Sequence, residues 1–195
     1  MLVRLALYFG VAIAAIAFAV PQTAWAQKPA QTPSASTPSD PFAEDTTLTS
    51  KPIVFVKGTG NWDTAYDTIT GALKTLKAYV AKEGLKTDGQ PMTIFTSTDD
   101  TGFQYQAAIP LAEPPKNPPR GDIGVGTSPE GHALKFVHRG SYDGLDNTYE
   151  AITNYLDEKK LEAKDMFIEQ YVTDPSDPVA TNEDHLVINV LVLVK

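Results

Sequence analysis

"KFVHRGSYDGLDNTYEAITNYL", residues 135–156, joins a β-like apolar run to a helical pattern through a glycine corner. A similar order occurs earlier in the chain, in "VFVKGTGNWDTAYDTITGAL", residues 54–73. At the two corners GNWD, residues 60–63, corresponds to GSYD, residues 140–143. The repetition predicts that the chain makes the same structural unit twice.

Hydrophobic periodicity extends both repeats to one order of strand, helix, strand and strand. The first half predicts strands over 52–57, 92–97 and 103–109 and a helix over 62–82, and the second predicts strands over 133–138, 166–173 and 186–194 and a helix over 145–156. Residues 122–127 are a candidate edge strand. One such unit leaves a sheet face bare, so we expect the two units to join. The predicted fold class is α+β, with one antiparallel sheet, two helices on one face and a ligand groove on the other.

The first 50 residues differ in composition from the rest of the chain. Residues 1–26 contain Arg4, an uncharged apolar run and Ala24-Trp25-Ala26, which predicts a signal peptide cleaved after Ala26 and a periplasmic protein. Residues 27–50 are rich in Pro, Ser and Thr and predict a flexible tether. Residues 51–195 form the predicted domain, divided into a first repeat over 51–111, a connector over 112–130 and a second repeat over 131–195.

Charge and composition narrow the class of partner. The chain has a formal net charge of -8 and no cysteine. An acidic chain without a basic patch argues against nucleic acid and against anionic membrane surfaces. None of the three histidines stands at metal-ligand spacing from another His or Cys, so we predict no metal and no cofactor.

The strand over 166–173 carries the candidate ligand-binding carboxylate. Side chains alternate faces along a strand, so Met166, Ile168 and Val172 form an apolar set suited to the helices. Phe167, Glu169 and Tyr171 then share the groove face. A carboxylate between two aromatic residues suits a cationic ligand, because aromatic faces attract cations. The alternative is that Glu169 points into open water.

Four other side chains are candidate ligand contacts, and each has a structural alternative. Trp62 and Tyr142 follow the two glycine corners and either line the ends of the groove or pack the helix starts onto the sheet. Tyr105 lines the groove or packs in the core. Asn189 interrupts the last apolar strand and either contacts a ligand or hydrogen-bonds across the sheet.

"FVHRGSYDGLDNTYEAITNYL" followed by "MFIEQYVTDP" and a terminal apolar strand resembles the GyrI-like small-molecule-binding domain, also called the AraC-type effector-binding domain. The resemblance covers residues 51–195. It implies a duplicated fold with a ligand groove between the halves, in which Glu169 meets cationic or polar groups of amphipathic ligands among aromatic side chains. Members of that family are often fused to a DNA-binding domain, and no such segment is found here.

Three functions follow from these patterns. The first is periplasmic capture of an amphipathic, cationic or polar aromatic small molecule by the groove glutamate. The second is implied by the resemblance: hydrolysis of reactive electrophiles, in which Glu169 acts as base or positions the water and Tyr171 or Tyr142 polarises the substrate. The third is inhibition of a protein partner through the acidic surface, for which residues 173–184 are the candidate segment. The protein partner for that third function is unknown, and stable membrane insertion after signal cleavage is not expected.

Overall fold

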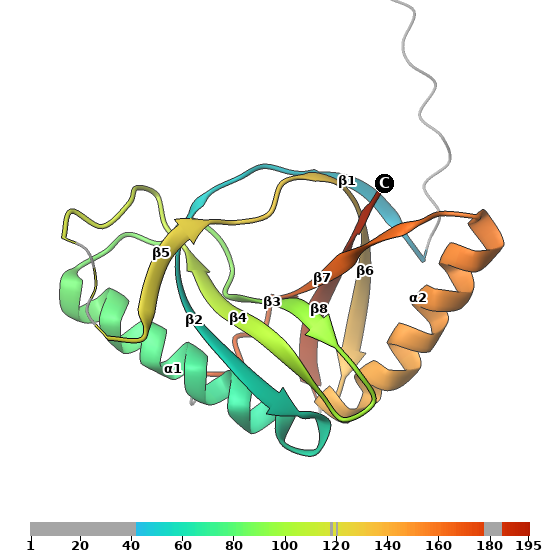
Figure 1. Cartoon of the computed structure of the whole chain (residues 1–195), viewed down its shortest axis with the longest axis horizontal. Helices are drawn as coiled ribbons and strands as arrows, with labels where there is room; N and C mark the ends of the chain where they lie inside the picture. The colour runs from blue at the N-terminus through green and yellow to red at the C-terminus, as the bar shows by residue number, and fades with distance from the viewer. Residues whose placement is uncertain (1–41, 118, 120, 178–184) are drawn as a thin grey trace, which may run out of the picture. The chain divides into compact units, whose positions relative to one another are not determined.

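A computed structural model describes residues 42–117, 119, 121–177 and 185–195 (Figure 1). All of them belong to one compact unit, Thr37–Lys195. Its elements are β1 (Glu44–Leu48), β2 (Pro52–Asn61), the short 3-10 helix η1 (Trp62–Thr64), α1 (Ala65–Glu83), β3 (Met92–Thr98), β4 (Gly102–Pro110), β5 (Ile123–Thr127), β6 (Gly131–Gly140), the 3-10 helix η2 (Tyr142–Gly144), α2 (Leu145–Lys159), β7 (Ala163–Tyr171) and β8 (Leu186–Val194). The predicted signal peptide and most of the predicted tether lie outside the described residues.

The eight strands form a single sheet in the order β1-β6-β8-β7-β3-β4-β2-β5. Every neighbouring pair is antiparallel. The order is symmetric about the β3–β7 pair, because β2-β4-β3 of the first half mirrors β6-β8-β7 of the second. This arrangement confirms the predicted α+β fold, in which two strand–helix–strand–strand units join into one sheet.

The sheet has a hydrophobic core on each of its faces. On the helix face, residues such as Leu73 and Leu76 of α1 and Ile152 of α2 pack with the sheet in one cluster. On the opposite face, Met92, Ile168 and Leu191 belong to a second cluster. Both faces of the central strands are therefore apolar over part of their length. The alternation of apolar and polar side chains that is typical of a sheet with one solvent-exposed face is absent there.

The two glycine corners start the helices in the same way. The Asn61 side-chain oxygen accepts a hydrogen bond from the Thr64 backbone N–H at 3.0 Å, and Ser141 Oγ accepts one from the Gly144 N–H at 3.3 Å. These bonds satisfy backbone donors at a helix start. Gly140 has φ +136°, a conformation that favours glycine. The corners hold Trp62 and Tyr142 at equivalent places in the two halves.

The predicted tether over 27–50 is wrong at its C-terminal end. Residues 44–48 form β1, which pairs with β6 in the register Glu44↔Lys135 to Leu48↔Gly131. Phe42 also packs on Phe136, with ring centroids 5.2 Å apart. The strand has no apolar alternation because its side chains are mostly exposed, and backbone pairing with β6 holds it in place.

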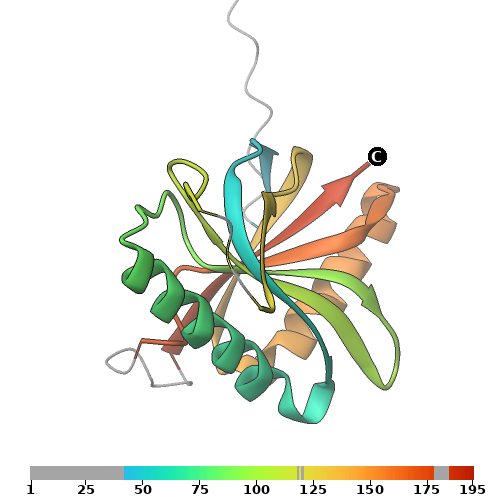
Figure 2. The same ribbon diagram turned by 60° about the vertical axis from the view of Figure 1, so that its left-hand side comes forward.

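Two short connections cross the opposite face at one end of the sheet, side by side (Figures 1 and 2). We call residues 49–51, between β1 and β2, the first crossing segment and residues 128–130, between β5 and β6, the second. In a flat sheet β1 and β2 would be roughly 29 Å apart, whereas the residues that join them reach about 14 Å. The sheet is therefore curled toward the opposite face at this end. Within the described residues, no helix is long and apolar enough to span a membrane.

Candidate functional site

A cavity of about 770 Å³ lies on the helix face where the two halves meet. Its walls come from both glycine corners and both helices, and β7 contributes to its lining. The lining residues are Trp62, Asp63, Ala65, Thr98, Tyr142, Asp143, Leu145, Asp146, Tyr149, Phe167 and Glu169. This volume is within the usual range for small-molecule sites, roughly 300–1,000 Å³.

Glu169 lies in this cavity with its carboxylate held by three tyrosine hydroxyls. Its side chain is only 2% exposed. Tyr149 donates to Oε1 at 2.8 Å, and Tyr171 and Tyr142 donate to Oε2 at 2.8 and 3.0 Å. The Tyr171 hydroxyl is also 2.9 Å from Thr93 Oγ1, and since Tyr171 donates to Glu169, Thr93 donates to Tyr171. The carboxylate is therefore buried but fully hydrogen-bonded, which is the condition under which such burial is tolerated.

Burial dominates the acid–base behaviour of this cluster. Desolvation raises the pKa of Glu169 above its ordinary value, and the tyrosine hydrogen bonds oppose that shift because they stabilise the ionised form. Burial, followed by the negative charge of Glu169, raises the pKa of Tyr142, Tyr149 and Tyr171 well above 10. The tyrosines thus stay protonated donors at neutral pH.

The cavity lining is acidic and aromatic. Four of the lining side chains are carboxylic acids, Asp63, Asp143, Asp146 and Glu169, and among the described lining residues none is Lys, Arg or His. Aromatic rings surround the glutamate: Phe167 lies 5.1 Å from Tyr149 between ring centroids. Such a lining has an unbalanced negative charge and π-faces, so its electrostatics favour a cation.

A comparison with protein families identifies the domain. The family model for the GyrI-like small molecule binding domain matches residues 46–195. The chain belongs to the GyrI-like small-molecule-binding domain family. Among curated proteins, no sequence matches this chain. The resemblance expected from the sequence is thereby confirmed, and the family match begins within β1.

Solved structures share the GyrI-like fold at low sequence identity. EcmrR, in its complex with DNA, matches with a TM-score of 0.67 and 14% identity. The match covers 78% of this chain but 57% of that one, so this GyrI-like chain corresponds to little more than half of EcmrR. A hydrolase from Listeria innocua matches with a TM-score of 0.56 and 12% identity over 80% of this chain and 93% of that one. SAV2435 bound to tetraphenylphosphonium matches with a TM-score of 0.53 and 18% identity over 78% of this chain and 93% of that one.

The predicted face of the groove is wrong for this GyrI-like domain. The sequence placed the cavity opposite the helices, with Ile168 toward them, but Glu169 and Tyr171 lie on the helix face. Ile168 belongs instead to the cluster on the opposite face. The reason is that an apolar cluster exists on both faces, and the tyrosine hydroxyls offset the cost of placing Glu169 under the helices.

The predicted site residues divide into those at the cavity and those away from it. Phe167, Glu169, Tyr142 and Trp62 line the cavity, and Tyr171 contacts Glu169 from below the lining. Two of the predicted ligand contacts, Tyr105 and Asn189, do not line this cavity. Tyr105 packs in the core of the helix face, with its ring against Gly58, whose lack of a side chain makes the space.

Asn189, the second of these, lies on the opposite face, where its amide donates to the Gln170 side chain at 3.1 Å. This is the cross-sheet hydrogen bond that the sequence left open as its alternative.

Tyr149 is the main site residue that sequence reasoning missed. It lies within the helix predicted over 145–156, at helical spacing from the apolar residues Leu145 and Ile152, and its hydroxyl is the donor to Glu169 Oε1. A tyrosine in a core-facing stripe is a detectable signal, because a buried hydroxyl needs a polar partner. Among the described residues, no group of three His, Cys, Asp or Glu side chains is arranged to hold a metal ion.

Proposed function

We propose that this GyrI-like protein captures a lipophilic organic cation in the cavity between its two helices. The observation that carries the proposal is the buried Glu169 carboxylate at the floor of an acidic, aromatic cavity with no basic residue among its described lining. An anionic ligand would meet four carboxylic acids and gain no ion pair. A cation meets one preorganised carboxylate and several ring faces.

The tyrosine cluster suits a bulky cation better than a small hydrated one. Both Glu169 oxygens already accept hydroxyl hydrogen bonds, so the ligand does not need to supply donors of its own. A charge spread over an apolar surface is weakly hydrated and is desolvated at low cost. Trp62, 41% exposed at the mouth, offers a further ring to such a ligand. The neighbour SAV2435, solved with tetraphenylphosphonium, supports this ligand class by analogy of fold.

A matched pair of probes tests the proposal. Methyltriphenylphosphonium is a permanent cation, and triphenylphosphine oxide is a neutral molecule of nearly the same size and shape. Trp62 is the tryptophan of the described residues and lines the cavity, so its fluorescence reports occupancy. We expect the cation to quench Trp62 saturably and the neutral probe to bind at least tenfold more weakly, since a desolvated cation–π contact is worth about 2 kcal/mol and the neutral probe has no charge with which to make one.

Glu169→Gln is the decisive variant and Glu150→Gln its control. Glu169→Gln keeps the side-chain shape and removes the charge, so the affinity for methyltriphenylphosphonium should fall to near that of the neutral probe. Glu150 is exposed on α2 and does not line the cavity, so Glu150→Gln should bind like the wild type. Equal affinity for the two probes, or an unchanged affinity in Glu169→Gln, contradicts the proposal.

Hydrolysis of a reactive electrophile is a second candidate, favoured by one observation. The pKa of Glu169 is raised by burial, which strengthens a carboxylate as a general base, and three tyrosine hydroxyls lie beside it. A neighbouring structure from Listeria innocua is described as a hydrolase. Loss of an epoxide such as styrene oxide, followed over time, would separate the two candidates: turnover that Glu169→Gln abolishes favours hydrolysis, and a stable ligand favours capture.

The periplasm is the location that we propose. It is supported by residues 1–26, with Arg4, an apolar run and the Ala24-Trp25-Ala26 cleavage pattern. In that compartment an exported binding protein would meet organic cations before they cross the inner membrane.

A further inference from the structure

A second cavity lies on the opposite face of the sheet, beneath the two crossing segments. It has a volume of about 180 Å³. Its walls are Thr47, Leu48, Thr49, Lys51, Asp88, Gly89, Met92, Pro110, Ser128, Pro129, Ile168, Gln170 and Leu191. None of these residues lines the cavity that contains Glu169. The two cavities are back to back across β7, since Glu169 lines one and its chain neighbour Gln170 lines the other.

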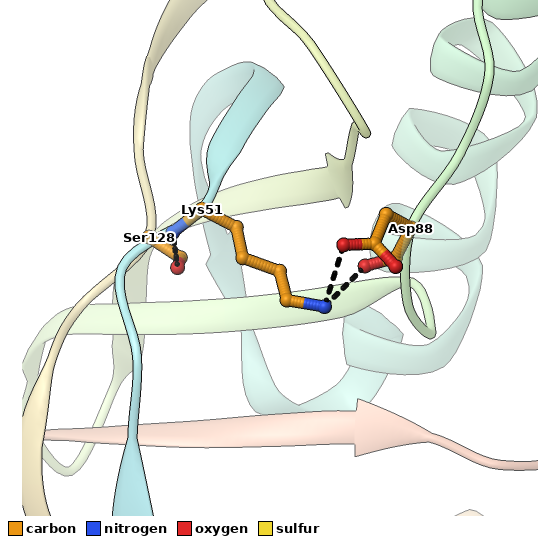
Figure 3. A network of polar contacts seen from close by, with 3 residues as sticks. All are labelled: Lys51, Asp88 and Ser128. Carbon is orange, nitrogen blue, oxygen red and sulfur yellow. Dashed lines mark hydrogen bonds and ion pairs between the residues drawn. The ribbon is translucent and has the colours of Figure 1, made fainter.

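Hydrogen bonds between the two crossing segments hold the roof of this second cavity. The Lys51 N–H donates to Ser128 Oγ at 3.0 Å, the Ser128 N–H donates to the Lys51 carbonyl at 2.8 Å, and Ser50 Oγ donates to the Ser128 carbonyl at 3.1 Å. Figure 3 shows Lys51 reaching from this roof to Asp88. Its Nζ donates to the Asp88 carbonyl at 2.8 Å and is 2.9 Å from Oδ2. Backbone groups and the Ser128 side chain thus join the two segments of the roof.

The polar groups of this cavity have spare donors. Lys51 Nζ carries three N–H groups, and its two contacts within the described residues are both to Asp88. The Ser128 hydroxyl accepts from Lys51, and its own hydrogen has no acceptor among the described residues. The Gln170 side-chain oxygen accepts from Asn189, whereas the Gln170 amide nitrogen has no partner within the described part of the chain. Three such donors around one space can together bind an acceptor-rich group.

The rest of the lining combines the polar residues Thr47, Thr49 and Asp88 with an apolar floor. Met92, Ile168 and Leu191 are at most 7% exposed and belong to the core of the opposite face. Cavities of about 150 Å³ with apolar linings are known to hold one small aromatic ring. A ligand for this space therefore needs a ring or a short chain at one end and an acceptor group at the other.

We propose that this second cavity binds a small carboxylic acid of the size of benzoate. Its carboxylate accepts hydrogen bonds from Lys51, Ser128 and Gln170, and its apolar part packs on Met92, Ile168 and Leu191. Asp88 is the acidic residue of the lining, and the ligand carboxylate competes with it for Lys51. That exchange is cheap because the Lys51 and Asp88 side chains are 38% and 56% exposed, and exposed ion pairs contribute little stability.

The test uses benzoate as the anion and benzamide as its neutral counterpart, titrated into the protein while backbone amide NMR signals are followed. We expect benzoate to shift the signals of Gly89, Ser128 and Gln170 saturably and to leave those of Trp62 and Tyr142 unchanged. Benzamide should bind at least tenfold more weakly, because it lacks the charge that pairs with Lys51. Equal binding of both compounds contradicts the carboxylate assignment, and the absence of saturable shifts around Ser128 contradicts the site.

Two variants separate this site from a general surface effect. Lys51→Met should weaken benzoate binding about tenfold or more, whereas Lys57→Met, at an exposed lysine of β2 outside the lining, should not. Gln170→Glu keeps an acceptor for Asn189 but replaces the spare amide donor with a carboxylate oxygen, so it should abolish benzoate binding.

The proposal is independent of cation capture. Glu169→Gln should leave benzoate binding unchanged, and Lys51→Met should leave methyltriphenylphosphonium binding unchanged. Benzoate affinity that follows Glu169 instead of Lys51 overturns the proposal.

Discussion

At the scale of single residues, the central feature is a carboxylate buried among hydroxyls. Removing an ionised carboxylate from water is expensive, and the cost is tolerated here because both oxygens of Glu169 accept charge-assisted hydrogen bonds. The effect of burial on the pKa of Glu169 is larger than the opposing effect of these hydrogen bonds, so the pKa is raised. The side chain is therefore preorganised for a cation that replaces the lost water.

The raised pKa of Glu169 makes cation affinity depend on pH. A bound cation stabilises the ionised form and so lowers the pKa in the complex. Affinity for methyltriphenylphosphonium should be full above the raised pKa of the free protein and fall as the pH drops through it, by up to about tenfold per pH unit. Titrations across the acid range check this, and Glu169→Gln should give a flat profile. A flat profile in the wild type would contradict it.

Protonation of Glu169 does not itself unfold the protein as the pH falls. The folded state binds the Glu169 proton more tightly than the unfolded state, because its pKa is raised above the ordinary value of 4.5. The contribution of this group to the free energy of unfolding therefore decreases as the pH rises through that window and is recovered as the pH falls. Glu169 itself favours the fold at the pH where cation binding weakens.

Tyr149 and Tyr142 should affect this profile unequally. Among the described residues, Tyr149 is the donor to Glu169 Oε1. Glu169 Oε2 accepts from both Tyr171 and Tyr142, so it still has one donor when the Tyr142 hydroxyl is removed. Tyr149→Phe should raise the pKa of Glu169 further and move the pH profile of cation affinity to higher pH, with a stability cost of about 1–3 kcal/mol. Tyr142→Phe should move the profile less. The same pH titrations measure both variants, and a larger shift for Tyr142→Phe would rule out this assignment.

At the scale of elements, the glycine corners position the site. Gly140 is the last residue of β6 and has φ +136°. The chain turns at this residue and places Tyr142, two positions later, where its hydroxyl donates to Glu169. His138 braces the same corner, with Nε2 2.8 Å from the Ser141 carbonyl and Nδ1 2.8 Å from Thr148 Oγ1. One side of the cation cavity therefore depends on a backbone conformation that favours glycine and that local hydrogen bonds support.

Replacing two glycines by alanine should have opposite effects on stability. Gly140→Ala places a side chain at a positive φ and should destabilise the fold by about 1–3 kcal/mol. Gly71 lies exposed in α1, and a Cβ there meets no atom within 4 Å, so Gly71→Ala should stabilise the fold by about 0.5–1 kcal/mol. Chemical denaturation measures both, and a neutral Gly140→Ala would show that the corner is not constrained.

The order of elements could be read from the sequence, but the orientation of the sheet could not. Seven of the eight strands and both helices were predicted because each has its own periodicity, and the predicted strand over 166–173 corresponds to β7, Ala163–Tyr171. Alternation along β7 correctly predicted that Ile168 and Glu169 lie on different faces of the sheet. It assigned Ile168 to the helix face and Glu169 to the opposite face, which is the reverse of the structure. Hydropathy alone favours Ile168 under the helices. The sequence does not show that a second core covers the opposite face or that Tyr149 reaches Glu169 from α2.

The edge of the sheet was missed for a related reason. The segment EDTTL, residues 44–48, is polar and follows a Pro- and Ser-rich stretch, so composition favoured a tether. Its pairing with β6 uses backbone hydrogen bonds, with the Lys135–Glu44 ion pair and the His132–Asp45 hydrogen bond beside them. Backbone pairing leaves no hydrophobic pattern in the sequence.

At the scale of the whole molecule, the doubled unit gives one sheet with a different cavity on each face. The cavity on the helix face is acidic and large, at about 770 Å³, and the one on the opposite face is small, at about 180 Å³, with spare donors. β7 contributes to both through neighbouring residues, Glu169 and Gln170. The two proposed ligands thus differ in charge, and Glu169→Gln and Lys51→Met each change one cavity only.

Export of the chain makes a prediction about its N-terminus. If residues 1–26 are a signal peptide, the protein recovered from the periplasm of a Gram-negative host should begin at Gln27. N-terminal sequencing or intact mass measures this directly. Full-length protein retained in the cytoplasm would contradict the proposed location without affecting the proposed ligand.

The most direct measurement of the central claim is the crystal structure of the protein with methyltriphenylphosphonium. The account predicts the cation between the Trp62 and Tyr142 corners, with its phosphonium centre near the Glu169 carboxylate and its phenyl rings against Phe167 and Tyr149. A cation bound elsewhere, with the Glu169–tyrosine cluster unoccupied at saturating ligand, would contradict it.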